Sequence, residues 1–478
     1  MKKILILIPA LLFFFASCNK DISYLNEDTK RSSTVPSYTL FSNGQRNLSD
    51  YLATPNVNTN IFELISQQWT EVTYVDESNY DLGTRSVADN WWRALYKNVL
   101  IDFQSARNLI PDDVTDATQQ KNELAMLDIM EVYTWSVLVN TYGNIPYTEA
   151  LDAANLFPKY DDAKTIYYDL LSRLDADITA LDASGDSFGG ADLLYNGNVD
   201  SWKKFANSLK LRMGITIADF DDAKAKSVIE SAAPGAFTSA SDNASFTYYV
   251  ATPNVNPVWT NVVQSGRNDF VAAEGIIAIM NANNDPRREA FFTGKGGNND
   301  SAFVGGVVGR GNAFPSYSHP SDLVEQPDFP FIFMSYSEVE FILAEAAERG
   351  YNVGGTAATH YTSAVKASLD FWGVSAADAA VYLAKPSVAY ATAAGTYKQK
   401  IGIQKYLSLY TNGFQTWVEQ RRLDYPVLIA PPTALSGYPV RFTYPVNEQN
   451  LNSGSWSAAK MNMGGTDAVE TKLFWDKF

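Results

Sequence analysis

The segment Leu124–Tyr142, with the sequence LAMLDIMEVYTWSVLVNTY, determines the fold class that we expect for this chain. Apolar side chains recur on almost every face of the helix that this segment predicts, a pattern typical of a helix buried on more than one side. Gly143 and Pro146 then indicate where the helix ends. We therefore expect a helical protein with this segment at the centre of its core.

Two amphipathic helices are predicted on the C-terminal side of this segment. In both, apolar residues recur every three or four positions and charged residues occupy the other faces. Either Asp200 or Ser201 suits the N-cap of the second helix. We expect the two helices to pair as a helical hairpin. The apolar positions are Ile166, Leu170, Leu174, Ile178 and Leu181 in the first helix, and Trp202, Phe205, Leu209 and Met213 in the second.

Further helices are predicted in the C-terminal half of the chain. The sequence Ser337-x-x-Glu340 predicts a capping box that begins a helix, and Gly350 predicts its end. Helices are also expected over Thr359–Trp372 and Phe414–Arg422. Pairs of antiparallel helices that recur along a chain favour a superhelical array.

Strands and long loops are expected at only a few places. The short segments Phe246–Val250 and Arg441–Tyr444 are rich in β-branched or aromatic residues and predict small β-hairpins. Two segments, Thr34–Tyr80 and Thr293–Asp328, are interpreted as loops longer than ordinary connections. Because long loops of an exported protein commonly carry the binding residues, we expect a ligand site there.

The composition excludes several classes of function. The chain has 478 residues, with 37 Lys and Arg against 53 Asp and Glu and a formal net charge of −16. This acidity disfavours nucleic acid as a partner, because a protein that binds phosphate backbones neutralises them with basic groups. One cysteine and two histidines, His319 and His360, are too few for a zinc site and exclude an internal disulfide. We predict neither a metal nor another cofactor.

The N-terminus has the features of an export signal. Two lysines precede the apolar run Ile4–Ala16, which is shorter than the about 20 residues that a spanning helix needs. The sequence that ends at Cys18 resembles a bacterial lipobox, with Phe15 where leucine is usual. We predict a lipoprotein signal peptide over residues 1–17 and a polar tether over 18–36, with Cys18 carrying acyl chains such as palmitate. The alternative is an ordinary secretory signal with an incidental cysteine.

The motif search favours a protein that is not an enzyme. The glycines at 294–297 and 305–311 fit neither a P-loop nor a dinucleotide-binding pattern, and a Ser-His-Asp triad would have only His319 or His360 to draw on. Acidic pairs at 112–113, 161–162 and 221–222 lie near expected helix starts, where the helix dipole favours negative charge. A glycoside hydrolase, which needs two suitably spaced carboxylates, is the least favoured alternative.

Eight short stretches between residue 142 and the C-terminal region carry a family resemblance. They are YGNIPYTEA (142–150), DLLYNGN (192–198), WKKFANSL (202–209), NDPR (284–287), EVEFILAEA (338–346), WVEQRR (417–422), RFTYP (441–445) and KLFWD (472–476). In this order, and behind a lipobox, they resemble the SusD/RagB family of nutrient-binding outer-membrane lipoproteins.

The resemblance implies a mostly α, SusD-like fold over residues 37–478, as one domain. In this fold, tetratricopeptide-like helix pairs form a right-handed superhelical scaffold beside a loop-rich, ligand-binding half. The resemblance also implies a lipid-anchored protein on the outer membrane, facing the cell exterior, with a SusC-like TonB-dependent transporter as partner. Such a protein captures oligosaccharides, or in some members peptides, and delivers them to the transporter without catalysis. Docking on the transporter without glycan affinity is the alternative.

Candidate ligand-binding residues are chosen by their chemistry. Aromatic faces flanked by polar groups suit sugar rings, which present apolar C–H faces together with hydroxyl edges. The family motifs are interpreted as structural instead: Glu340 and Glu345 are expected to pair with basic groups, and Arg421 and Arg422 beside Glu419 to form an ion-paired scaffold. The candidates are Trp69, Tyr74, Tyr80 and Arg85 before the first long helix, and Asn312, Phe314 and Tyr317 in the glycine-rich loop.

Overall fold

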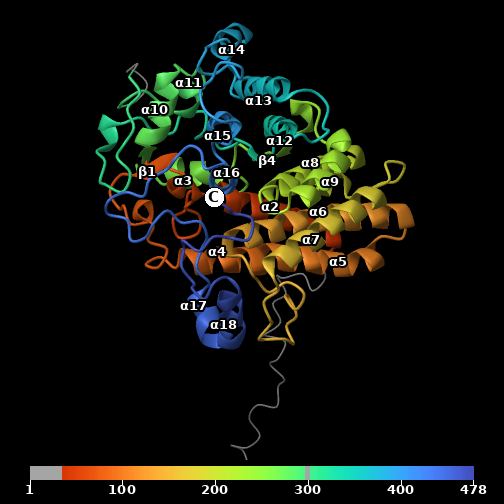
Figure 1. Cartoon of the computed structure of the whole chain (residues 1–478). Coiled ribbons are helices and arrows are strands. Elements are labelled where there is room, and N and C mark those ends of the chain that lie inside the picture. The colour runs from red at the N-terminus through yellow and green to blue at the C-terminus, as the bar shows by residue number, and fades with distance from the viewer. Residues whose placement is uncertain (1–34, 297–301) are drawn as a thin grey trace, which may run out of the picture. The chain divides into compact units, whose positions relative to one another are not determined.

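Helices dominate the computed structural model, which describes residues 35–296 and 302–478 (Figure 1). Residues Ser37–Phe478 form one compact unit. Within the described residues, we find no helix that is both long and apolar enough to cross a membrane. The predicted signal peptide and Cys18 lie outside the described residues.

The central helix is α6 (Ala117–Tyr142), and it is buried along most of its length as predicted. The side chain of Asp116 caps its N-terminus by accepting hydrogen bonds from the backbone N–H groups of Thr118 and Gln119. Gly143 follows the last helical residue with a φ of 86°. A Cβ atom there would lie 2.6 Å from the sulfur of Met463, so both backbone and packing require glycine.

Paired helices stack against α6, which confirms the mostly α scaffold. Figure 1 shows α5, α6 and α7 side by side, with α8 and α9 next to them. The predicted pair α7 and α8 is in contact, although α7 packs more extensively on α6 and α8 on α9. The paired helices are α2 (Ser37–Ala53) with α5 (Ile101–Asp113), α6 with α7 (Ala163–Ala180), α8 (Val199–Thr216) with α9 (Asp222–Ala232), and α12 (Tyr336–Glu348) with α13 (Ala357–Phe371).

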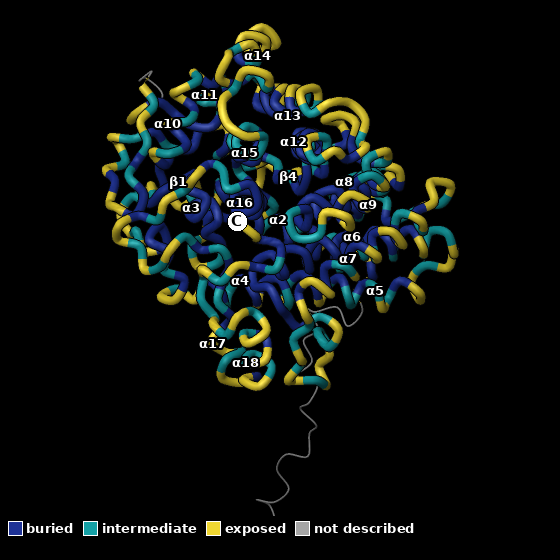
Figure 2. The backbone as a smooth tube through the Cα atoms, viewed as in Figure 1, coloured by how far each residue is buried: buried dark blue, intermediate teal, exposed yellow. Residues whose placement is uncertain are grey.

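The remaining helices, none longer than α5, cover the outside of this scaffold or link it to the loop-rich half. Buried residues, dark blue in Figure 2, concentrate in the scaffold helices and α16, whereas α14 is mostly exposed. These helices are α3 (Phe62–Ile65), α4 (Val87–Leu95), η3 (Tyr96–Leu100), α10 (Glu274–Ala282), α11 (Arg288–Phe291), α14 (Ala376–Leu383), α15 (Tyr397–Ser408), α16 (Gly413–Leu423), α17 (Val446–Leu451) and α18 (Ser453–Asn462). Shorter helical turns include η2 (Glu77–Asn79) and η7 (Trp259–Gln264).

Two small antiparallel sheets join segments far apart in the sequence. Strand β1 (Trp69–Glu71) pairs with β3 (Phe270–Ala272), and β2 (Ala244–Phe246) pairs with β4 (Phe331–Met334). The predicted hairpins are therefore wrong, because each strand finds its partner through tertiary packing rather than through a tight turn. Residues 441–444 form no strand, since the Arg441 guanidinium instead binds Asp467 and the carbonyl oxygen of Tyr142.

The predicted long loop over Thr34–Tyr80 is also wrong. Helix α2 occupies much of it and buries Phe41, Leu48 and Leu52 on one face. The polar residues between these positions obscured the helical stripe. Gly44 lies where a Cβ atom would come within 2.4 Å of the Phe103 ring, so this glycine permits close packing against α5.

Three predicted helix boundaries need correction. Asn198, rather than Asp200 or Ser201, caps α8 by accepting a hydrogen bond from the backbone N–H of Ser201. Ser335, rather than Ser337, caps α12, and the Ser337 hydroxyl donates to the carbonyl oxygen of Ala364 inside the fold. The acidic pair at 112–113 lies at the end of α5 and not at a helix start, whereas Asp162 and Asp221 are N-caps as the dipole argument predicts.

A buried ionic cluster connects α12, α15 and α16. The Arg422 guanidinium contacts Glu345 at 2.6 Å and Glu419 at 2.7 Å, and the Lys405 ammonium lies 3.0 Å from Glu419. Burial by itself raises the pKa of the Glu419 carboxyl, but Arg422 and Lys405 outweigh it and lower this pKa to about 2. The predicted pairing of Glu345 with a basic group is confirmed. Glu340 is likewise 2.8 Å from the His360 ring nitrogen.

Arg421 was expected in the same ionic scaffold, and that prediction is wrong. Its guanidinium lies over the ring of Trp417, 3.5 Å from the centroid, and donates to the carbonyl oxygens of Val440 and Asn140. Burial lowers the pKa of this guanidinium to about 9.

Candidate functional site

A polar groove of about 350 Å³ lies at one end of the β1–β3 sheet. Its walls come from the loop after α2, the segment after β1, the turn before α4, and η7 with the segment that leads into β3. The lining residues are Pro55, Asn56, Val57, Asn58, Glu71, Thr73, Tyr74, Arg85, Thr260, Asn261, Ser265, Arg267, Asp269 and Phe270.

Backbone pairing holds the two sides of the groove together. In the register of the sheet, Glu71 lies opposite Phe270. One residue further, the backbone N–H of Val72 donates to the carbonyl oxygen of Asp269 at 2.9 Å. The chain then turns away from the sheet and leads to Tyr74, whose side chain is 62% exposed. The sheet therefore places an accessible aromatic ring at the edge of a polar groove.

The loop after α2 presents amides to the groove in a fixed arrangement. The side-chain oxygen of Asn56 accepts hydrogen bonds from the backbone N–H and the side-chain amide of Asn58, at 3.1 and 2.8 Å. The side chain of Asn90 in α4 donates to the carbonyl oxygen of Asn58 at 2.8 Å and ties this loop to the scaffold. Amides offer both donors and acceptors, which match the hydroxyl groups of a polar ligand.

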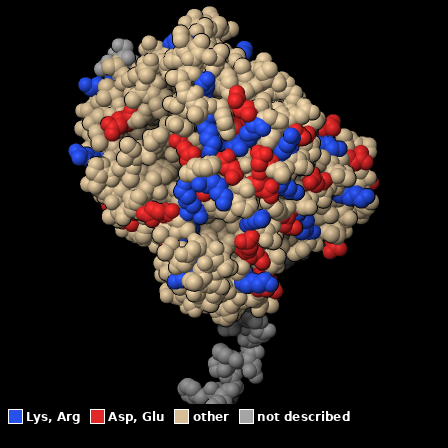
Figure 3. All heavy atoms as spheres, in the orientation of Figure 1, with Lys and Arg blue, Asp and Glu red and all other residues tan. Residues whose placement is uncertain are grey.

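The arginines of the groove are paired with carboxylates. The Arg85 guanidinium contacts Glu77 at 2.6 Å, and the Arg267 guanidinium contacts Asp269 at 2.6 Å. These pairs largely cancel the local charge, so the groove suits a neutral polar ligand better than a strongly charged one. Over the wider surface, Figure 3 shows basic and acidic side chains interspersed on the face drawn, a pattern unlike the basic face of a nucleic-acid binder.

The backbone around the groove is strained at three places. Gln67, Tyr80 and Ser86 have φ values of 53°, 63° and 52°, in the left-handed region that non-glycine residues rarely adopt. Such residues commonly cluster at functional sites, where the surrounding packing holds them in place. Here the Tyr80 hydroxyl accepts a hydrogen bond from the side chain of Gln67 at 3.0 Å.

Of the seven candidate ligand residues, Tyr74 and Arg85 lie together in the groove. Trp69 and Tyr80 are 2% and 3% exposed, and the Trp69 indole donates to the Tyr410 hydroxyl. Asn312 is buried and uses its amide to hold the carbonyl oxygens of Glu71, Val307 and Arg310. These three side chains stabilise the protein, and we do not retain them as ligand contacts.

Phe314 and Tyr317 lie outside the lining of the groove. Both are half-buried, and Phe314 stacks on the ring of His319 with the centroids 4.2 Å apart. A ligand role for these two residues stays a prediction.

Several groove residues were missed by the sequence analysis, among them Asn56, Asn58, Asn261, Arg267 and Asp269. They are polar residues of loops and of the short turn η7, and no periodicity marks such positions. The one available signal was the polar run NVNTN at 56–60, which lies in a segment that was already expected to carry ligand contacts.

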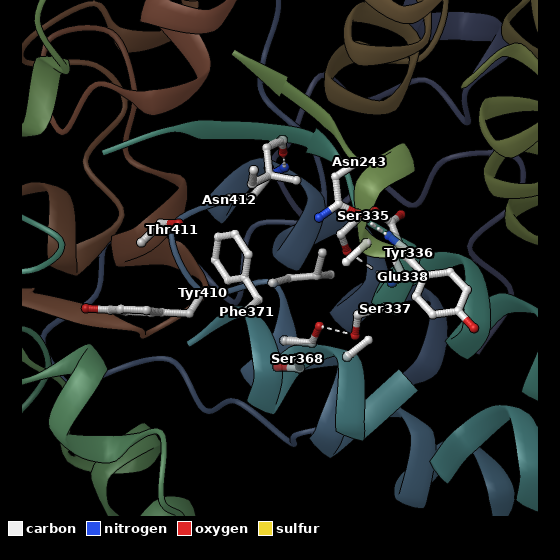
Figure 4. A pocket seen from close by; sticks show the side chains of 15 residues that line it. Asn243, Ser335, Tyr336, Ser337, Glu338, Ser368, Phe371, Tyr410, Thr411 and Asn412 are labelled. Carbon is white, nitrogen blue, oxygen red and sulfur yellow. Dashed lines mark hydrogen bonds between the residues drawn. The ribbon is translucent and has the colours of Figure 1, made fainter. Parts of the chain in front are cut away.

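A second pocket, of about 40 Å³, lies among β4, α12, α13 and the α15–α16 junction (Figure 4). Hydroxyl groups line it, and the oxygens of Ser337 and Ser408 are 2.7 Å apart. Phe371 forms part of the wall. Because one water needs about 10–15 Å³ of such space, this pocket has room for only a few waters and is too small for a sugar ring. Among the described residues, we find no group of three His, Cys, Asp or Glu side chains that could hold a metal ion.

A family model decides the relationship of this chain to known proteins. The SusD-like model described as "Starch-binding associating with outer membrane" matches residues 29–445. The chain belongs to this SusD-like family. No curated protein is similar enough to count as a relative.

Solved structures show the same SusD-like fold over nearly the whole chain. A structure titled as a chitin-binding protein is 27% identical, with a TM-score of 0.81, and the match covers 92% of this chain and 100% of that one. A SusD homolog from Bacteroides uniformis is 26% identical, with a TM-score of 0.77 over 92% and 100% of the two chains. A chitin-binding SusD homolog from Flavobacterium johnsoniae, 24% identical with a TM-score of 0.78, covers 91% and 98% and supports the fold alone.

Proposed function

We propose that this SusD-like protein captures an oligosaccharide in the groove beside Tyr74 and delivers it to a SusC-like TonB-dependent transporter. The observation that carries the proposal is the exposed Tyr74 ring at the edge of a polar, nearly charge-balanced groove. The ring offers an apolar face to the C–H groups of a sugar. The side chains of Asn56, Asn58 and Asn261 line the same groove, and the amide groups that their local hydrogen bonds leave free can pair with its hydroxyl groups.

The structural relatives supply the first ligand to test. A protein that shares 27% of the sequence and the whole fold is titled as chitin-binding, so chitin oligosaccharides are the first probes. A chitin unit carries hydroxyls and a neutral acetamido group, which fits amides and paired charges better than a uronic acid would. Lipid anchoring at Cys18, an outer-membrane location facing the exterior and transfer to the transporter belong to the same proposal.

Replacing Tyr74 with alanine is expected to weaken oligosaccharide binding about tenfold. The physical reason is the loss of one ring-stacking contact, worth about 1.4 kcal/mol. Calorimetric titration of residues 19–478 with chitin, starch and plant oligosaccharides, and with peptides, measures the effect.

Tyr249→Ala is the matched control for this titration. Tyr249 is 63% exposed, like Tyr74 at 62%, but it lies outside the groove lining. Equal losses in the two variants would count against the groove, and a loss confined to Tyr317→Ala would move the site to the glycine-rich loop.

The same titrations separate the alternative functions. If no glycan gives a heat of binding but the protein still binds the transporter, the docking role is favoured. If only peptides give a heat of binding, peptide capture is favoured. Product release from any glycan would revive the hydrolase alternative.

A further inference from the structure

Two buried carboxyl groups lie at the groove, and only one of them, that of Glu77, has a basic partner among the described residues. Glu71 lines the groove and is 4% exposed, and Glu77, in η2, is 0% exposed. The guanidinium of Arg85 contacts one oxygen of Glu77 at 2.6 Å. Two buried negative charges beside a single cation are costly, because burial removes the water that would otherwise stabilise them.

Within the described part of the chain, the hydrogen bonds around Glu71 and Glu77 leave one buried carboxyl oxygen without a donor. Ser78 donates its backbone N–H to Glu71 Oε2 at 2.8 Å, and its hydroxyl oxygen accepts from the backbone N–H of Glu71 at 3.2 Å. The second carboxyl oxygen of Glu77, Oε2, is buried and has no hydrogen-bond donor among the described residues. Glu71 lies within hydrogen-bonding reach of Glu77, so a proton on Glu71 would satisfy this oxygen. Burial, together with the nearby Glu77 and against the donation by Ser78, raises the pKa of Glu71 to about 8.

We propose that Glu71 and Glu77 share one proton, and that this carboxylic acid–carboxylate pair positions Arg85 and Tyr74 in the groove, so that affinity for glycan falls in alkaline solution. The inference rests on the proposed function of the groove. The pair closes the turn between β1 and η2, and Tyr74 lies within that turn. Loss of the proton places two anions side by side, and their repulsion opens the turn.

The other charged groups near Glu71 do not replace this proton. Arg267 and Asp269, in the segment leading into β3, are paired with each other at 2.6 Å. Burial raises the pKa of the Glu63 carboxyl in α3 to about 7, but this carboxyl accepts from the backbone N–H of Gly413 at 3.1 Å and lies outside the groove lining. Burial raises the pKa of Tyr80 to about 12, so this phenol stays neutral through the pH range in question. The alkaline change is therefore expected from Glu71.

Binding of a chitin hexasaccharide, or of the glycan that binds best in the titration above, is expected to be about thirtyfold weaker at pH 9.5 than at pH 7. This loss follows if only the protonated pair binds and its proton dissociates near pH 8. In the Glu71→Gln variant, which keeps a donor for Glu77 but cannot ionise, the loss is expected to be less than twofold. Glu325→Gln is the control: burial raises the pKa of that carboxyl to about 7, but it lies outside the groove, so the variant keeps the wild-type loss.

A measurement on the unaltered protein covers the case in which Glu71→Gln does not fold. Titrations at pH 8 in buffers of different ionisation enthalpy are expected to show uptake of about half a proton per bound glycan. Affinity that is equal at pH 7 and 9.5, an alkaline loss that Glu71→Gln retains in full, or binding without proton uptake would each overturn the proposal. Absence of glycan binding already at pH 7 would instead overturn the proposed function.

Discussion

Arg422→Met is expected to lower the free energy of unfolding by about 3–5 kcal/mol. Methionine keeps most of the side-chain volume but removes the cation between Glu345 and Glu419, which are 0% and 2% exposed. Each carboxylate would then lose the favourable interaction with Arg422, which offsets part of the free-energy cost of burying a negative charge. Chemical denaturation at neutral pH, followed by circular dichroism, measures the loss.

Lys366→Met is the control for this measurement. It removes an ion pair with Asp370 at 2.6 Å whose side chains are 55% and 46% exposed, and water screens such pairs strongly. Its unfolding curve is expected to match that of the wild type closely. Equal effects of the two substitutions would show that the buried cluster contributes no more than a surface pair.

The same cluster gives the wild type an acid-sensitive component of stability. The pKa of Glu419 is lowered to about 2, and that of Glu345 is lowered as well, by Arg422 against the opposing effect of burial. A carboxyl with a lowered pKa stabilises the fold fully above its ordinary value near 4.5, and this contribution is lost as the pH falls towards 2. Between pH 5 and 2, Arg422→Met should therefore lose less additional stability than the wild type, as thermal unfolding at each pH would show.

Cys18→Ala is expected to move the protein from the membrane fraction to the soluble fraction of the cell envelope. The predicted anchor is a thioether-linked diacylglycerol with an additional amide-linked chain, and two such signals are needed for stable attachment to a bilayer. Fractionation after a high-salt wash, followed by immunoblotting, measures the change. Ser17→Ala, which keeps the cysteine, is the matched control and should remain in the membrane fraction. A Cys18→Ala variant that still sediments with washed membranes would contradict lipid anchoring.

The scaffold could be predicted because its signal is local. Leu124–Tyr142 is a continuous apolar run, and the stripes through Leu170 and Leu209 repeat with the helical period. Each lies within an observed helix, although α6 begins seven residues before Leu124. The interpretation of Glu345 and Arg422 as structural residues also holds, because charged residues on a buried helix need partners.

The groove could be predicted only in part, because its geometry depends on distant segments. Tyr74 and Arg85 were chosen for their chemistry, but nothing local to either residue indicates that Arg267 and Asp269 lie in the same groove. Trp69 has the same aromatic character as Tyr74 and yet is buried, since β1 pairs with β3 and turns the indole into the core. All three residues of β1 are buried, and the local sequence does not encode that both faces of so short a strand are covered.

The pairing of β1 with β3 has a consequence for the order of folding. The helix pairs from α5 to α9 are close in sequence and need only short stretches of chain to meet. By contrast, Trp69 pairs with Ala272, and the Gln68 side chain donates to the carbonyl oxygen of Tyr406. Contacts of such long sequence separation form slowly, because a large loop must close first. The groove, which depends on the β1–β3 pair, is therefore expected to form after the local helix pairs, and a chain truncated before β3 would keep such pairs without a finished binding surface.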